Sequence, residues 1–105
     1  MAEFTLSEIL TATGGRLAGP EYQKSFTGIS TDTRTLRPGN LFIALKGEKF
    51  DGHDYLVRAV DSGAAGVIIS KKDVYVPERT TAILVDDPLV AFQQLARFHR
   101  LRFSI

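Results

Sequence analysis

Apolar residues along this chain fall into short blocks separated by polar turns, and the first block has the spacing of a helix. Its apolar positions recur every three or four residues, which places them on one helical face. Thr5 stands before this block and Glu8 follows three residues later, the arrangement of a capping box. Gly14-Gly15 then marks the end of the helix. The residues expected on its inner face are Leu6, Ile9 and Leu10.

Five further runs predict β-strands, at residues 16–18, 26–31, 41–45, 66–69 and 82–85. The last three runs are almost wholly apolar, which is typical of strands buried on both faces of a sheet. In the run 26–31, the alternation of strand side chains predicts that Phe26, Gly28 and Ser30 share one face. Glycine and proline residues mark the turns that bound several of these runs.

Two more helices are expected between and after these strands. Residues 55–62 predict one, with Asp54 as its N-cap and Gly63 at its end. Asp87-Pro88 begins the other, because Asp is a favoured cap and Pro suits the first helical position. The residues expected on its inner face are Leu89, Phe92, Leu95 and Ala96. This order of elements predicts an α/β fold, a small mixed, partly parallel sheet with helices packed on it.

Length and composition fit a single domain over residues 1–105. The chain is 44% hydrophobic and 24% charged, as in ordinary globular proteins, and it has no cysteine, which excludes disulfides and thiolate zinc sites. A net charge of +1 with interspersed signs argues against a nucleic-acid partner. No apolar run has the length of a membrane span, and the N-terminus lacks the features of a secretory signal. A cytoplasmic protein is therefore expected.

The first polar cluster is Ser-Thr-Asp-Thr-Arg at residues 30–34, at the end of a predicted strand. If the extended conformation continues, Ser30, Asp32 and Arg34 share one side. Such a cluster offers hydroxyls that can hydrogen-bond a sugar or a base, and a guanidinium suited to phosphate. The simpler alternative is that Asp32 and Arg34 pair locally while the hydroxyls satisfy the backbone of a turn. Spacing alone favours this alternative.

The second polar cluster is the loop at residues 46–54, between a buried strand and a helix. Open α/β sheets bind ligands in loops at the carboxyl ends of their strands. Two glycines in the loop allow backbone N–H groups to approach an anion, and two lysines and His53 add positive charge. The alternative is a solvated connection in which Asp51 or Asp54 caps the helix.

The sequence shows no complete catalytic set. It contains no G-x-x-x-x-G-K-[ST] phosphate loop, no G-x-S-x-G elbow and no cysteine nucleophile. His53 and His99 lie far apart, without the spacing of metal ligands. We therefore expect this chain to hold a substrate rather than to transform it, with no catalytic residue, no metal site and no bound cofactor.

Taken in order, four motifs resemble the N-terminal domain of the Mur ligases. They are Ser-Thr-Asp-Thr-Arg at 30–34, Arg-Pro-Gly-Asn-Leu-Phe-Ile-Ala-Leu-Lys-Gly-Glu at 37–48, Phe-Asp-Gly-His-Asp at 50–54 and Gly-Ala-Ala-Gly-Val at 63–67. The resemblance spans nearly the whole chain. Ala-Leu-Lys-Gly-Glu with Phe-Asp-Gly-His-Asp is most similar to the branch of the family that adds D-alanyl-D-alanine. The branch that adds the third stem-peptide residue is the alternative.

This resemblance implies a part in peptidoglycan precursor synthesis. Mur ligases are cytoplasmic three-domain enzymes whose first domain holds the UDP end of a UDP-N-acetylmuramoyl-peptide. Their second domain binds ATP and Mg²⁺, and their third helps to bind the incoming amino acid or dipeptide. By this resemblance the chain binds the UDP moiety of UDP-N-acetylmuramoyl-tripeptide and is inactive without its ATP-binding and C-terminal domains. A non-enzymatic α/β interaction module is the remaining alternative.

The resemblance also implies which residues form the site. Thr33 matches a hydroxyl residue that contacts the uridine part of the substrate, and the segment after the buried strand matches one that lines the uracil and the diphosphate. The implied UDP-binding residues are Thr33, Asp32, Arg34, Gly47, Glu48, Lys49 and Phe50. The residues implied to shape the loop are Asp51, Gly52 and His53. The two clusters are therefore expected to meet in one cleft.

Overall fold

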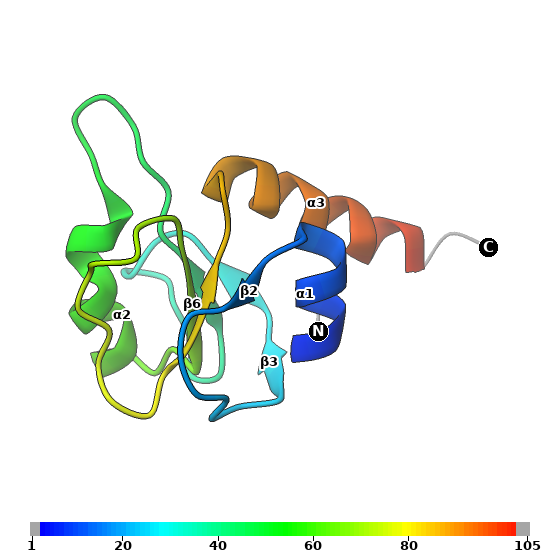
Figure 1. Cartoon of the computed structure of the whole chain (residues 1–105), viewed down its shortest axis with the longest axis horizontal. Coiled ribbons are helices and arrows are strands. Elements are labelled where there is room, and N and C mark those ends of the chain that lie inside the picture. The colour runs from blue at the N-terminus through cyan, green and yellow to red at the C-terminus, as the bar shows by residue number, and fades with distance from the viewer. Residues whose placement is uncertain (1–2, 103–105) are drawn as a thin grey trace.

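A central five-stranded sheet organises the protein, whose computed structural model describes residues 3–102 (Figure 1). The strands lie in the order β2–β7–β6–β5–β4. Their bounds are Arg16–Leu17 for β2, Ile29–Ser30 for β4, Leu41–Ile43 for β5, Gly66–Ile69 for β6 and Thr81–Leu84 for β7. Strands β4 to β7 are parallel, whereas β2 pairs antiparallel with β7. The predicted mixed, partly parallel sheet is confirmed.

Helices cover both faces of this sheet, so its central strands are fully buried. Helices α1 (Leu6–Thr13) and α3 (Pro88–Arg102) lie on one side, and η1 (Gly52–Tyr55) and α2 (Leu56–Asp61) on the other (Figure 1). Along β5, Leu41 and Ile43 belong to the core beneath α1 and α3, whereas Phe42 belongs to the core beneath α2. None of the described helices is long and apolar enough to cross a membrane.

The first helix forms as its capping signals predict. The backbone N–H of Glu8 donates to Thr5 Oγ1 at 3.1 Å, and that of Thr5 donates to Glu8 Oε1 at 2.8 Å. Gly14 ends the helix in the left-handed region at φ 70°. Leu6 and Ile9 are buried, as expected of the inner face.

A break at Gly28 divides the run predicted as one strand over residues 26–31. Its first part is β3 (Ser25–Thr27), which pairs with β1 (Glu3–Thr5) in a separate two-stranded sheet, and its second part is β4. Gly28 has φ 91°, a conformation that rotates the chain between the two sheets. The prediction that Phe26, Gly28 and Ser30 share one face is wrong, because alternation is lost where φ becomes positive.

The helix after the polar loop begins earlier than predicted. Asp51, not Asp54, is the capping residue, and its side chain accepts a hydrogen bond from the backbone N–H of His53. The first turn, η1, is a 3₁₀ helix, and α2 continues from Leu56. The cap lies at Asp51 because the tight 3₁₀ turn already starts at Gly52.

The inner face of α3 is rotated from the predicted one. Leu95 is buried and Phe92 partly buried, as expected, but Leu89 and Ala96 are exposed. Pro88 and Ala91 occupy the buried positions instead. The helix begins where predicted, with Asp87 Oδ1 accepting from the backbone N–H of Leu89 at 2.9 Å. Contact with α1 and with the ring of Phe4 sets its rotation, which helical periodicity alone does not specify.

Candidate functional site

A cleft of about 380 Å³ lies between the segment that follows β4 and the start of α2. It is at the carboxyl ends of β4 and β5, the edge at which open parallel sheets bind ligands. The two polar clusters, at residues 30–34 and 46–54, both contribute to it. Its lining residues are Thr31, Asp32, Thr33, Arg34, Phe42, Phe50, Tyr55 and Arg58.

One wall of the cleft is a tight turn that begins at the end of β4. Ser30 Oγ donates to the backbone carbonyl of Asp32 at 2.9 Å and accepts from its N–H at 3.2 Å. The carboxylate of Asp32 accepts from the backbone N–H of Arg34 at 2.9 Å. The extended conformation therefore does not continue past β4, so Ser30, Asp32 and Arg34 do not share one side of a strand, and the alternative of a local turn is the one found. Thr31 and Thr33 line the cleft from this turn.

Asp32 and Arg34 form a two-point ion pair within the turn, as the simpler alternative predicted. Arg34 Nε lies 3.0 Å from Asp32 Oδ1, and Arg34 Nη2 lies 2.8 Å from Asp32 Oδ2. These hydrogen bonds lower the pKa of Asp32 to about 2 and raise the pKa of Arg34. Both groups are accessible to water, so the pair organises the turn more than it stabilises the fold.

Removing the guanidinium should raise the pKa of Asp32. In Arg34→Gln we expect the titration midpoint of its carboxyl, followed by NMR, to move from about 2 toward the ordinary value of about 3.9. A depressed pKa in the folded state contributes stability above the unfolded pKa and loses it as the pH falls through the folded pKa. The wild-type pair should therefore weaken between about pH 4 and pH 2. An unchanged midpoint in the variant would contradict the pairing.

The opposite wall of the cleft is aromatic and carries a cation. The rings of Phe50 and Tyr55 stack with their centroids 5.3 Å apart and an interplanar angle of 25°. The guanidinium of Arg58 lies 5.5 Å from the centroid of the Tyr55 ring. Phe50 is 45% exposed, so part of its surface is open to a ligand. Among the described residues no carboxylate forms an ion pair with Arg58, in contrast to Arg34.

The base of the loop between β5 and η1 is packed against the sheet at Gly52. Its backbone N–H donates to the carbonyl of Leu45 at 2.6 Å. A Cβ at this position would lie 2.8 Å from both Ala44 Cα and Leu45 N, closer than real Cβ atoms approach backbone. Only glycine therefore fits here, and His53, the next residue, is carried into the protein interior with a side chain that is 2% exposed.

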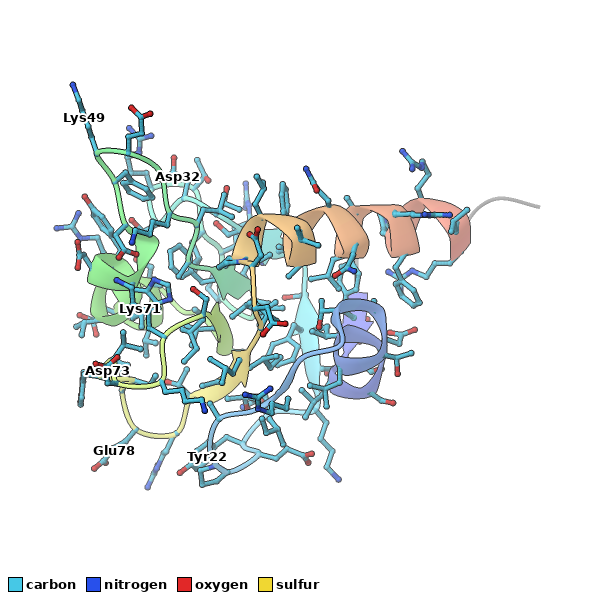
Figure 2. The ribbon with its side chains drawn as sticks, turned by 45° about the horizontal axis from the view of Figure 1, so that its top comes forward. Tyr22, Asp32, Lys49, Lys71, Asp73 and Glu78 are labelled. Carbon is cyan, nitrogen blue, oxygen red and sulfur yellow. The ribbon has the colours of Figure 1, made fainter. Side chains whose placement is uncertain are left out.

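The structure places the sequence-predicted UDP-binding residues in two groups. Thr33, Asp32, Arg34 and Phe50 line the cleft. Gly47, Glu48 and Lys49 do not line it, and instead form the outer loop (residues 46–50), whose turn is closed by the N–H of Gly47 donating to the carbonyl of Phe50 at 2.7 Å. Figure 2 shows Lys49 at the tip of this loop, pointing away from the rest of the ribbon.

No metal-binding arrangement is found in the part of the chain that the structure describes. Residues 3–102 contain no group of three or more His, Cys, Asp or Glu side chains placed to hold an ion.

A larger hollow of about 750 Å³ lies beside α1, lined among others by Leu6, Leu10 and Lys24. It contains neither an arginine nor an aromatic ring, so the cleft beside α2 has the chemistry better suited to a nucleotide.

Comparison with known proteins decides the family. The model of the family described as "Mur ligase family, catalytic domain" matches residues 25–100, which include both walls of the cleft. The chain belongs to the Mur ligase family. The resemblance found in the four sequence motifs is thus confirmed.

Curated members of the Mur ligase family match three quarters or more of the chain. A UDP-N-acetylmuramoyl-tripeptide–D-alanyl-D-alanine ligase of Bacillus subtilis is 43% identical over 98 residues, which are 92% of this chain and 21% of the relative. Its counterpart in Escherichia coli is 38% identical over 101 residues, 95% of this chain and 21% of the relative. A 2,6-diaminopimelate ligase of Geobacter metallireducens is 39% identical over 79 residues, 75% of this chain and 15% of the relative. The chain spans about a fifth of the length of the first two.

A solved Mur ligase structure has the same fold over the described chain. The UDP-N-acetylmuramoylalanyl-D-glutamyl-2,6-diaminopimelate–D-alanyl-D-alanyl ligase of Acinetobacter baumannii aligns with a TM-score of 0.84 and 27% sequence identity. The alignment covers 99% of this chain and 23% of that structure. The α/β fold predicted for residues 1–105 is therefore a fold that this family uses.

Four residues of this Mur ligase cleft were not assigned to the site from sequence. Thr31 belongs to the Ser-Thr-Asp-Thr-Arg cluster but is not among the UDP-binding residues that the resemblance implies, and it lines the cleft together with Thr33. The other three residues look in the sequence like ordinary core or surface residues. They are Phe42 on β5, Tyr55 on η1 and Arg58 on α2. The spacing Tyr-x-x-Arg at 55–58 is a usable signal, because positions three apart share a helical face.

Proposed function

We propose that this domain holds the UDP end of UDP-N-acetylmuramoyl-tripeptide for a ligase that adds D-alanyl-D-alanine in peptidoglycan precursor synthesis. The observation that carries the proposal is the cleft in which Thr31 and Thr33 face an aromatic wall that bears Arg58. The names of the relatives from Bacillus subtilis and Escherichia coli supply the substrate and the reaction.

The chemistry of the cleft suits each part of a uridine nucleotide. A pyrimidine ring can stack on the exposed surface of Phe50, since every base has a π-face that aromatic side chains recognise. The hydroxyls of Thr31 and Thr33 can hydrogen-bond a base edge or a ribose. Arg58 is suited to the diphosphate, because a guanidinium forms two-point hydrogen bonds with phosphate oxygens. A volume of about 380 Å³ lies within the usual range of small-molecule sites.

The contribution of this domain to the reaction is positional. Holding the nucleotide end fixes where the peptide carboxylate of the substrate is presented, and such orientation lowers the barrier of a reaction that occurs elsewhere. No stretch of this chain has the pattern of a phosphate loop, so we assign ATP and Mg²⁺ to the other domains of the full-length enzyme. We expect the 105-residue chain alone to bind UDP and to be inactive as a ligase.

Titration of the chain with UDP, followed by ¹H–¹⁵N NMR, tests the proposal. We expect fast-exchange shifts at residues 31–34 and at Phe50, Tyr55 and Arg58, with little change along α1. Uridine should shift the aromatic wall, and UDP should shift Arg58 in addition. The same spectra without shifts in the cleft at millimolar UDP would refute the proposal and favour the alternative of a non-enzymatic α/β interaction module.

Arg58→Ala should weaken UDP binding about tenfold or more, because a hydrogen bond to a charged group contributes roughly 1.5–3 kcal/mol net of water and about 1.4 kcal/mol is a factor of ten. Uridine binding should change little, since uridine has no phosphate. The matched control is Arg97→Ala, which removes an exposed arginine from α3. Equal UDP affinities in Arg58→Ala and the control would exclude Arg58 from the diphosphate site. Isothermal titration calorimetry provides both dissociation constants.

The sister reaction, addition of the third stem-peptide residue, is the second candidate function. The similarity to the diaminopimelate ligase of Geobacter metallireducens favours it at 39% identity, over fewer residues than the Bacillus subtilis match. Both reactions use a UDP-linked muramoyl peptide, so the cleft serves either. Assays of the full-length enzyme with UDP-N-acetylmuramoyl-dipeptide and -tripeptide separate the two: D-alanyl-D-alanine incorporated into the tripeptide supports the first proposal.

A further inference from the structure

The carboxylate of Asp51 is the centre of a cluster that joins two segments distant in sequence. Asp51 Oδ1 accepts from the backbone N–H of His53 at 3.0 Å and from its ring Nδ1 at 2.7 Å. Asp51 Oδ2 accepts from the ammonium of Lys71, which belongs to the loop after β6 and is labelled in Figure 2. We call Asp51, His53, Ser70 and Lys71 the Asp51 cluster.

The ring of His53 extends this cluster to the backbone after β6. The N–H of Ser70 donates to His53 Nε2 at 3.0 Å, so Nε2 carries no proton. The proton is therefore on Nδ1, where it is donated to Asp51. Because this ring is buried and both nitrogens are hydrogen-bonded within the protein, His53 serves as a fixed link rather than as an acid or a base.

Lys71 keeps the centre of the cluster charged. Its hydrogen bond to Asp51 is the largest cause of an Asp51 pKa well below the usual range. The pKa of Lys71 is raised in turn, first by Asp51 and then by the more distant Asp54 and Asp73. The side chain of Asp51 is 17% exposed, so water screens this pair less than it screens Asp32 and Arg34.

The Asp51 cluster adjoins the aromatic wall of the cleft along the chain. Phe50 precedes Asp51 in the chain and stacks on Tyr55, two residues beyond His53. The outer loop is closed mainly on itself, through Gly47 and Phe50 and through the bridge between Lys46 and Asp51. Asp51 is therefore the residue at which the bridge to Lys46 and the hydrogen bond to Lys71 both reach the segment that carries Phe50.

We propose that Lys71 is a positioning residue of the cleft: by holding Asp51 from the loop after β6, it fixes the backbone that presents Phe50 to the ligand. The proposal rests on the proposed function of the cleft, since its consequence is measured as nucleotide affinity. Lys71 does not line the cleft and acts only through Asp51. Lys71 thus connects the aromatic wall, which follows β5 in the chain, to the loop after the neighbouring strand β6.

The test compares Lys71→Met with Lys72→Met, which removes the neighbouring exposed ammonium. We expect Lys71→Met to bind UDP about fivefold more weakly, because an unfixed side chain must be ordered on binding. The free energy of unfolding should fall only modestly, because the Lys71 side chain is 40% exposed and exposed ion pairs contribute little. Contacts between the Phe50 and Tyr55 rings, measured as NOEs without ligand, should weaken. Lys71→Arg should restore both readouts, and Lys72→Met should alter neither.

Each result has a defined meaning. Full UDP affinity and intact ring NOEs in Lys71→Met would overturn the proposal, as would a Lys71→Arg variant that behaves like Lys71→Met. Adding Lys71→Met to Asp51→Asn should cause no further loss, and an additive loss would show that Lys71 acts by another route. If the wild-type chain fails to bind UDP, the proposed function fails. The ring NOEs of the unliganded variants then still decide whether Lys71 positions Phe50.

Discussion

Gly52→Ala is expected to lower the free energy of unfolding by about 2–3 kcal/mol, because it forces a methyl group into packed backbone. The added Cβ would lie 2.8 Å from Ala44 Cα and from Leu45 N. Neither can move away easily, since the N–H of Ala44 donates to the carbonyl of Ile68 in the adjacent strand. The loop must shift instead, which displaces the turn that contains Asp51 and Phe50. We therefore expect UDP affinity to fall together with stability.

Gly47→Ala is the matched control for this prediction, because it changes another glycine of the same loop. The nearest atom to a Cβ at position 47 is the Phe50 carbonyl oxygen at 4.0 Å, and Gly47 has no positive φ. The free energy of unfolding of Gly47→Ala should stay within about 0.5 kcal/mol of the wild-type value. Urea denaturation measures both variants. If Gly52→Ala and Gly47→Ala unfold at the same urea concentration, the backbone around Gly52 accommodates the methyl group and the prediction is wrong.

Phe26→Ala is expected to cost about 3–5 kcal/mol, the usual loss when a fully buried phenylalanine is truncated in a core that cannot collapse. Phe26 is 0% exposed and pairs with Phe4 between β3 and β1. Its ring lies against Gly66 of β6, where a Cβ would be 2.6 Å from the ring. The ring thus fills space that the glycine leaves open, and its loss creates a cavity between the two sheets.

Denaturation of Phe26→Ala and Tyr75→Ala checks this prediction. Tyr75 is 70% exposed, so its truncation should change the free energy of unfolding by no more than about 0.5 kcal/mol. Because the larger loss approaches the total stability of a small domain, Phe26→Leu provides a variant that retains most of the apolar volume. A Phe26→Ala chain as stable as Tyr75→Ala would show that the core repacks around Gly66.

Features that depend on neighbouring residues in the chain were predictable from sequence. The capping box of Thr5 and Glu8 lies within one turn, and the buried strands are read from continuous apolar runs. The meeting of residues 30–34 with Phe50 was also expected, because the carboxyl ends of parallel strands share an edge. In the first two cases a local signal predicts the structure, and in the third the general rule for parallel sheets does.

Features that depend on distant segments were not predictable. The division at Gly28 arises because β3 pairs with β1 while β4 pairs with β5, and no local pattern reports those partners. Tyr55 and Arg58 line the cleft beside Phe50, whose ring the outer loop brings onto the Tyr55 ring. Lys71 is 20 residues from Asp51, so its contact appears only in three dimensions.

Both edges of the five-stranded sheet are strands of two residues, β2 and β4. An exposed edge offers unpaired backbone groups to any passing strand, and long flat edges promote fibril growth. Here β4 ends at Ser30 and is followed by the turn that contains the charged pair Asp32 and Arg34, and β2 ends before Gly19-Pro20. The domain is therefore poorly suited to recruiting further strands, which should keep it monodisperse at the millimolar concentrations used in NMR.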